Sequence, residues 1–296
     1  YIVFNEVFMA VIVTGGGGFI GSNLVDKLIE QGQDVLVVDN FSTGYPLNVH
    51  KKAKLITRDI RQGFLDIKEL REIKPDVIYH IAALARIQPS FQRPAETLEV
   101  NSQGTVRVLE YAKFVGTKVV YAGSSSFYFD PHANPYAYSK WIGEEHCKMY
   151  NKVYGVPTAI ARFFNVYGPR HVKDGENAAM LGIFERQRKN NEPLTVTGTG
   201  EQRRDFTHVN DICSGLMAMA EKEWNGDVFN LGRSNNYSVN EVAQMFKPKE
   251  IKYIPARPGE AWETLADLSF TKEKLNWEPT HNLPDYVNKF LETLGE

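Results

Sequence analysis

Short apolar runs alternate with helical stretches along the first half of the chain. The runs lie at 10–13, 35–38, 53–57, 76–81, 118–122 and 158–162. Apolar runs this short are typical of strands buried on both faces, as in a parallel sheet. Between the first two, apolar residues recur at helical spacing and Gly32 would end the helix; they are Phe19, Ile20, Leu24, Val25, Leu28 and Ile29. The alternation predicts an α/β fold built on a doubly wound parallel sheet.

The alternation loosens after Gly168 and Pro169. We therefore expect a sheet-forming domain over residues 1–168 and a smaller C-terminal α/β lobe over 169–296. Residues 205–232 are expected to return to the sheet. A chain of 296 residues is long enough for one such core and one smaller lobe.

The first apolar run leads directly into a glycine-rich turn. Gly15, Gly18 and Gly21 stand at three-residue intervals. In a dinucleotide-binding turn the first glycine permits a tight bend, the second lets the backbone approach a pyrophosphate, and the third lets the next helix pack closely. The N-terminus of that helix directs free N–H groups at the phosphates. The spacing predicts a Rossmann-type dinucleotide site.

Asp39 follows the second apolar run, at the place where such folds carry an acid about 20 residues beyond the glycines. A carboxylate there accepts hydrogen bonds from the adenosine ribose and repels a 2′-phosphate, which favours NAD over NADP. The competing interpretation is a glycine-rich loop in some other α/β protein. The order of strand, glycines, helix, strand and acid favours the dinucleotide site.

A candidate proton-transfer group follows the fifth apolar run. That run leads into Ser124, and Tyr136 and Lys140 stand four residues apart, on one face of a helix. A lysine cation close to a phenol lowers its pKa from about 10, so the tyrosine can take a proton from a hydroxyl while hydride leaves for a nicotinamide. The competing interpretation is a chance Tyr-x-x-x-Lys pair, which the position after the fifth strand disfavours.

These motifs resemble those of the extended short-chain dehydrogenase/reductases, in particular the NAD-dependent epimerase/dehydratase family that acts on nucleotide sugars. The resemblance runs from Met9 to the C-terminus and is strongest for UDP-glucose and UDP-N-acetylglucosamine 4-epimerases. It rests on Thr14–Gly21, Asp39–Gly44, Asp59–Ile60, His80–Ala83, Asn101, Tyr136–Lys140, Arg162–Arg170, Arg204–Thr207, Arg257–Glu260 and Ala266–Asp267.

The resemblance implies a role for each matching residue. The catalytic residues would be Ser124, Tyr136 and Lys140. The NAD contacts would come from Gly15, Gly18, Phe19, Ile20, Gly21, Asp39, Asn40, Asp59, Ile60, Ala82, Ala83, Asn101, Tyr136, Lys140 and Phe163. The substrate, a UDP-sugar, would be bound by Ser124, Asn165, Arg204, Arg257 and Thr264.

Arg204 and Arg257 would clamp the substrate diphosphate, because guanidinium groups suit bidentate contacts to phosphate. The competing interpretation for both is surface ion pairing with the adjacent Asp205 and Glu260.

The residues after Ser124 separate the activities of the family. Dehydratases of the family carry an Asp-Glu pair there, and decarboxylases carry a glutamate at the second position. This chain has Ser125 and Ser126, which cannot act as carboxylate acids or bases. The resemblance therefore implies 4-epimerisation, in which a transient 4-keto sugar turns over and receives the hydride on its other face while the NAD stays bound.

Substrate preference is less tightly specified. Thr264 matches the position that gates the sugar pocket in 4-epimerases, and a small residue there admits plain and N-acetylated hexoses. The chain departs from the family in a short 125–135 segment, and Thr197 stands where an aromatic residue often meets the nucleobase. Two alternatives stay open. One is another nucleotide-sugar epimerase or reductase, acting on another base or on a uronic acid. The other is a non-catalytic NAD-binding sensor.

Composition excludes several other classes. A net charge of −2 means that the chain has no excess of positive charge with which to bind nucleic acid or an acidic membrane surface. Two cysteines cannot form a disulfide framework and suit the cytoplasm, and the histidines have no metal-ligand spacing with them. No apolar run approaches the ~20 residues of a membrane span, and residues 1–8 lack the features of a signal peptide. From the family we expect a homodimer formed through helices near 94–115 and 136–154.

Overall fold

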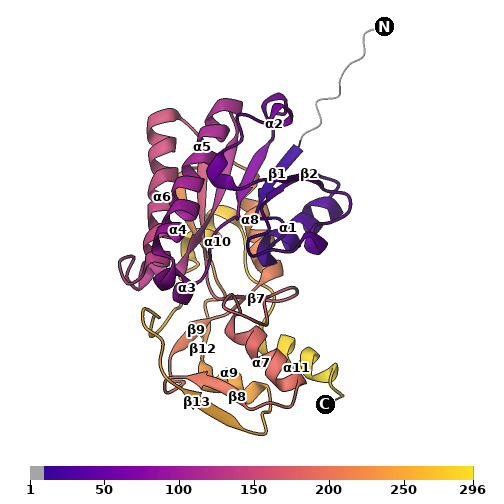
Figure 1. Cartoon of the computed structure of the whole chain (residues 1–296), viewed down its shortest axis with the longest axis vertical. Coiled ribbons are helices and arrows are strands. Elements are labelled where there is room, and N and C mark those ends of the chain that lie inside the picture. The colour runs from indigo at the N-terminus through magenta and orange to yellow at the C-terminus, as the bar shows by residue number, and fades with distance from the viewer. Residues whose placement is uncertain (1–9, 296) are drawn as a thin grey trace.

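A parallel sheet forms the centre of the larger lobe (Figure 1). The computed structural model describes residues 10–295, so the expectation for residues 1–8 lies outside the described part. The sheet has seven strands in the order β11-β6-β5-β4-β1-β2-β3, and every neighbouring pair is parallel. The strands are β1 Ala10–Thr14, β2 Asp34–Asp39, β3 Lys54–Thr57, β4 Val77–His80, β5 Lys118–Ser124, β6 Thr158–Phe163 and β11 Asn225–Leu231. The predicted α/β fold with a Rossmann-type sheet is confirmed.

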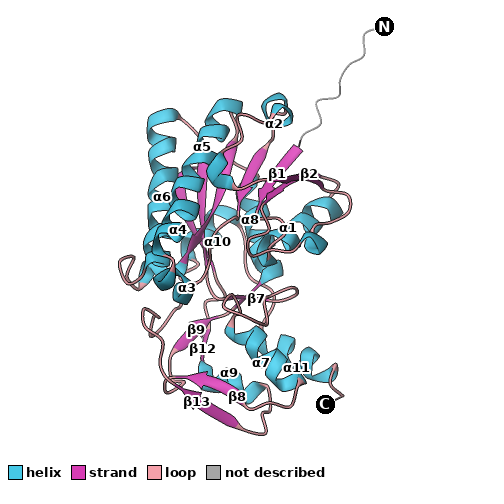
Figure 2. Ribbon diagram, in the orientation of Figure 1, coloured by secondary structure: helices cyan, strands magenta, loops and turns pink. Residues whose placement is uncertain are grey.

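Helices cover both faces of the sheet, which makes three layers (Figure 2). One face packs against α1 (Phe19–Glu30) and α8 (Val209–Ala220), and the other against α5 (Gly104–Val115) and α6 (Pro135–Tyr154). Alternate residues of one strand supply the two cores: Val11 and Val13 of β1 lie in the first and Ile12 lies in the second. Both faces of β1 are therefore buried, as its unbroken apolar run predicts.

Three short helices and a π-helical turn precede α5 in the sequence. They are α2 (Lys68–Glu72), α3 (Ile87–Gln92), α4 (Pro94–Leu98) and a π-helical turn, Glu99–Gln103, that leads into α5. The predicted helix near 94–115 is thus three consecutive pieces rather than one regular helix.

The smaller lobe has a core of its own, at the lower end of the molecule in Figure 1. It contains α7 (Met180–Lys189), α9 (Val239–Met245) and α11 (Leu283–Glu292). Short two-stranded sheets complete it: β7 Val166–Tyr167 with β10 Thr207–His208, β9 Arg203–Asp205 with β12 Asn236–Ser238, and β8 Leu194–Thr197 with β13 Ile251–Ile254.

The chain crosses between the lobes more than once. Strand β11 pairs with β6, so the expected return of 205–232 to the sheet takes place. A second return was not expected: Ala266, Leu268 and Trp277 lie in the core of the larger lobe, around α10 (Ser269–Leu275). These crossings place several segments of the smaller lobe opposite the carboxyl ends of the sheet strands.

Residues 10–295 contain neither a membrane-spanning helix nor a cluster of metal ligands. No helix in that range combines the length and apolar character needed to cross a membrane. The same range contains no group of three or more His, Cys, Asp or Glu side chains arranged to hold a metal ion.

Candidate active site

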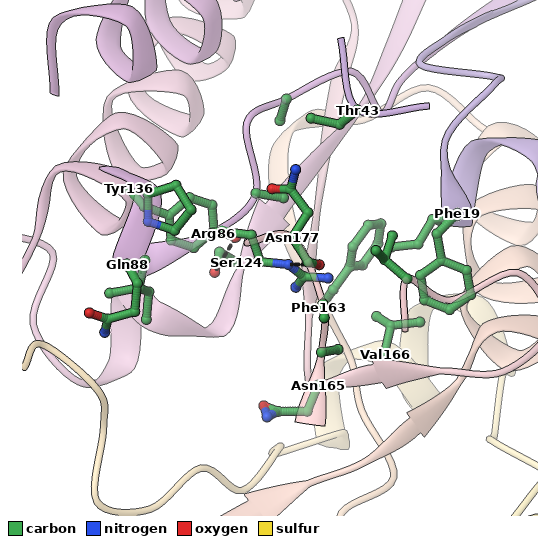
Figure 3. A pocket seen from close by; sticks show the side chains of 18 of the residues that line it. Phe19, Thr43, Arg86, Gln88, Ser124, Tyr136, Phe163, Asn165, Val166 and Asn177 are labelled. Atoms are coloured by element: carbon green, nitrogen blue, oxygen red, sulfur yellow. Dashed lines mark hydrogen bonds between the residues drawn. The ribbon is translucent and has the colours of Figure 1, made fainter. Parts of the chain in front are cut away.

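A cavity of about 700 Å³ lies at the carboxyl ends of the sheet strands, where the strand order reverses between β1 and β4 (Figure 3). Ligands of doubly wound folds bind at this position. Its walls come from the glycine turn, from the segments after β2, β4, β5 and β6, and from residues of the smaller lobe. Of the twenty residues expected at the site, all but Asn101 and Lys140 line the cavity.

The glycine turn leaves no room for side chains. Gly15 has a φ of +76°, and a Cβ there would lie 2.8 Å from the Cα of Ala82. A Cβ on Gly21 would overlap the carbonyl oxygen of Gly15. Helix α1 begins after Gly18 without any side-chain cap, so N–H groups of its first turn face the cavity unpaired. The turn therefore has the form that a pyrophosphate requires.

The acidic residues expected at the adenosine end are held in place by hydrogen bonds. The Asp39 carboxylate accepts from the backbone N–H of Gly17 at 2.8 Å and of Phe41 at 2.7 Å. Asn40 donates to Asp59 at 3.0 Å. Hydrogen bonds from Arg61 keep the pKa of Asp59 below its usual value. Each Asp39 oxygen retains a lone pair for a ribose hydroxyl, so the wall fits an NAD adenosine.

Ser124 and Tyr136, which we expect to take part in proton transfer, lie within hydrogen-bonding distance of each other. Ser124 is the last residue of β5, and Tyr136 lies in the first turn of α6, which begins at a helix cap made by Asn134. The Tyr136 hydroxyl donates to the Ser124 Oγ at 3.3 Å. The Ser126 hydroxyl also donates to this Oγ, at 2.8 Å. A substrate hydroxyl in the cavity can therefore reach both oxygens.

The electrostatics of Tyr136 differ from the sequence-based expectation. Burial raises the pKa of its phenol, and the hydrogen bond with Ser124 and the charge of Arg86 oppose that rise. The Lys140 Nζ lies 4.3 Å from the centre of the Tyr121 ring, and Lys140 does not line the cavity. Burial lowers the pKa of Lys140 to about 8, against an opposing effect of Glu144. That Lys140 lowers the pKa of Tyr136 stays a prediction.

Arg162 and Glu144 form a buried ion pair next to the carboxyl ends of the strands. Arg162 of β6 donates three hydrogen bonds to Glu144 of α6, the shortest at 2.6 Å. Their side chains are 6% and 1% exposed. The guanidinium also stacks on Phe127, 3.5 Å from the ring centre. The pair connects α6, which carries Tyr136, to β6, which ends beside the cavity at Phe163.

Asn101 lies behind the cavity rather than in its wall. Its amide accepts from the N–H of Leu84 and donates to the Leu84 carbonyl and to Ser139. It thus fastens the segment after β4 to α6 from the π-helical turn. A direct NAD contact is not supported by this position, because all three polar contacts of the amide are made within the protein.

The expected substrate residues lie on the opposite wall. Arg204 donates to the carbonyls of Arg203 and Trp262 and lies 3.7 Å from Glu260. The alternative of an ion pair with Asp205 is excluded, because that carboxylate accepts from three backbone N–H groups in the interior. The Thr264 hydroxyl accepts from the N–H of Asp205 at 3.1 Å. Asn165 and Arg257 also line the cavity.

Several polar residues of the cavity wall were not selected from the sequence, among them Arg86, Gln88, Glu176 and Asn177. Arg86 could have been found, since it follows the carboxyl end of the fourth strand, where ligand-binding residues concentrate. Glu176 and Asn177 belong to an irregular segment whose position only the tertiary fold decides.

Comparisons with known proteins agree with this geometry. Residues 11–232 match the NAD dependent epimerase/dehydratase family. A Methanocaldococcus jannaschii protein named "Putative UDP-glucose 4-epimerase" is 35% identical, over 95% of this chain and 97% of its own length. UDP-glucuronic acid decarboxylase 1 of Arabidopsis thaliana is 34% identical, over 95% of this chain and 70% of its own length. The crystal structure of the Thermotoga maritima UDP-glucose 4-epimerase with UDP-glucose has a TM-score of 0.88 at 29% identity, covering 97% of this chain and all of that one.

Proposed function

Because the chain belongs to the NAD-dependent epimerase/dehydratase family, we propose that it inverts C4 of a UDP-hexose. It is an NAD-dependent isomerase of the epimerase type. The observation that carries the 4-epimerase proposal is the Tyr136–Ser124 hydrogen bond at the strand edge, followed by serines at 125 and 126.

The residues of the site divide the work as follows. In its deprotonated form, Tyr136 takes the proton of the substrate C4 hydroxyl and becomes the neutral phenol, and Ser124 bridges the two oxygens. The chemistry that bound NAD would supply here is acceptance and return of the C4 hydride. Arg204 and Arg257 hold the diphosphate while the 4-keto sugar turns within the cavity. Tyr136 then gives the proton back when hydride arrives on the opposite face.

The carboxylates around the cavity favour epimerisation over elimination or decarboxylation. Four acidic residues line it: Asp39, Asp59, Glu176 and Glu260. The first two belong to the adenosine end, Glu176 pairs with Arg93, and Glu260 lies by Arg204. None of these follows Ser124 on the strand edge. The chain therefore lacks, beside its reacting centre, the carboxylate that the resemblance assigns to dehydratases and decarboxylases.

For the sugar, the proposal includes UDP-glucose/UDP-galactose and UDP-N-acetylglucosamine/UDP-N-acetylgalactosamine. Thr264, Ser125 and Phe129 line both the main cavity and a second cavity of about 320 Å³, which Leu265 also lines. A small residue at the boundary leaves this space for a substituent such as an N-acetyl group.

We also propose a homodimer that works in the cytoplasm. Exposed apolar side chains lie on α5 and α6, at Phe114, Met149, Val153 and Tyr154. A face of this kind is suited to association with a second copy. Both cysteines, Cys147 and Cys213, are free and buried, which suits a reducing compartment. Sedimentation at two protein concentrations tests the dimer.

The first experiment incubates the purified protein with UDP-glucose, UDP-N-acetylglucosamine and UDP-glucuronic acid in turn, without added NAD, and identifies the products by NMR. A C4 epimer supports the proposal and a retained cofactor. A UDP-pentose from UDP-glucuronic acid would instead indicate a decarboxylase. If NAD binds but no sugar is converted even with NAD supplied, the 4-epimerase proposal fails in favour of a reductase of another substrate or an NAD sensor.

A further inference from the structure

Arg86 reaches into the cavity beside the reacting pair. It stands between β4 and α3, and Figure 3 shows it extending from the side of Tyr136 and Ser124 toward Asn177. Its Nε donates to the Asn177 carbonyl at 2.7 Å. This bond fixes the direction of the guanidinium and leaves its two terminal NH₂ groups for other acceptors.

No carboxylate of residues 10–295 forms an ion pair with Arg86. Arg58 and Arg204 line the same cavity, and each has an acid nearby: Asp66 at 2.7 Å and Glu260 at 3.7 Å. Burial lowers the pKa of the Arg86 guanidinium, and Tyr136 is the one ionisable group whose charge opposes this effect. A desolvated cation without an anion is costly, and a ligand anion removes that cost.

The position of Arg86 separates it from the phosphates. The NAD pyrophosphate belongs to the glycine turn, and the substrate diphosphate belongs to Arg204 and Arg257. Figure 3 shows Arg86 beside Ser124, whereas Arg204 donates to the carbonyls of Arg203 and Trp262. Arg86 therefore lies near the sugar carbon that reacts, and the anion it meets must be carried by the sugar itself.

We infer that Arg86 binds a carboxylate at C6 of the substrate sugar, so that the protein prefers a nucleotide-linked hexuronic acid to the neutral UDP-hexoses of the proposed function. C6 is bonded to C5, the neighbour of the reacting C4, which places the carboxylate next to the group that Tyr136 contacts. Two parallel N–H donors of a guanidinium match two carboxylate oxygens. A neutral hexose offers only a hydroxyl there and leaves the cation unpaired. This inference rests on the proposed 4-epimerase activity.

The test compares kcat/KM for UDP-glucuronic acid and UDP-glucose in the wild type, Arg86→Gln and Arg86→Lys. We expect the wild type to prefer the uronic acid. Loss of a desolvated charge pair is worth about 2–5 kcal/mol. Arg86→Gln should therefore lower kcat/KM for UDP-glucuronic acid at least ~30-fold more than that for UDP-glucose, which loses only the effect of the Arg86 charge on Tyr136. Arg86→Lys should recover part of the loss, because lysine keeps the positive charge but lacks the two parallel N–H donors of the guanidinium.

A matched control tests whether losing any arginine contact to the 175–179 segment, rather than losing the Arg86 guanidinium from the cavity, changes the substrate preference. Arg93 pairs with Glu176 of the same segment but does not line the cavity. Arg93→Gln should leave the ratio of the two substrates unchanged. Melting temperature and NAD content confirm that each variant is folded and loaded.

Each other outcome overturns the inference in a recognisable way. If the wild type epimerises UDP-glucose and not UDP-glucuronic acid, the assignment of the carboxylate is wrong while the 4-epimerase proposal stands. If Arg86→Gln slows both sugars equally, Arg86 acts on the reacting oxygen rather than on C6. If NAD is bound but neither sugar is converted, both the inference and the proposed function are wrong.

Discussion

The buried pair of Glu144 and Arg162 offers the most direct test of how the site is supported. Glu144→Ala removes the carboxylate that accepts three hydrogen bonds and leaves a guanidinium 6% exposed without its partner. Breaking such a pair costs about 3–5 kcal/mol. For a protein of this size, about 2–4 °C of melting temperature accompanies each kcal/mol, so the midpoint should fall by on the order of 10 °C.

The adjacent Glu145 provides the control. It is exposed and pairs with Lys148 at 2.8 Å within one helix turn. Surface pairs of this kind contribute less than about 1 kcal/mol, so Glu145→Ala should move the melting temperature by only a degree or two. Thermal unfolding followed by circular dichroism measures both variants under the same conditions.

A double variant distinguishes a lost pair from a lost side chain. Replacing both partners, as Glu144→Leu with Arg162→Met, removes the unpaired charge, and we expect at least half of the stability to return. A Glu144→Ala protein as stable as Glu145→Ala would refute this reasoning. So would a double variant that is less stable than Glu144→Ala, since the cost would then come from packing rather than from an isolated charge.

Three further predictions concern catalysis and NAD. Tyr136→Phe should lower kcat by about 10²–10⁴-fold while NAD stays bound, as checked by product NMR and by cofactor released on denaturation; normal turnover would remove Tyr136 from its role. Activity that needs the Lys140 ammonium should be present below pH 8 and decline above it, because the pKa of Lys140 is about 8. Glu144→Gln removes the charge that raises this pKa, so the alkaline limb of the kcat–pH profile should move to lower pH; an unchanged limb would contradict this. Gly21→Ala should abolish NAD retention, because the added Cβ overlaps the Gly15 carbonyl oxygen. If the purified variant holds as much NAD as the wild type, the glycine turn does not bind the pyrophosphate as proposed.

The sequence alone determined the sheet-forming half of the molecule. Apolar runs without polar alternation specify strands buried on both faces, and β1 divides its side chains between two cores accordingly. The glycine spacing and Asp39 could be predicted because they belong to one local unit of strand, turn, helix and strand. Ser124 and Tyr136 could be predicted for the same reason, since the end of β5 and the start of α6 are close along the chain.

Only the tertiary structure decided which charges meet at the site. The spacing of Tyr136 and Lys140 predicts that the lysine acts on the phenol, and packing of α6 on β5 decides that the Lys140 Nζ lies over the Tyr121 ring and is buried. Arg86 acquires its place through a bond to Asn177, 91 positions away in the sequence. Sequence patterns record local periodicity, whereas the burial and pairing of charges depend on contacts between distant segments. For that reason the proposed catalytic pair could be selected from the sequence, and the cation beside it could not.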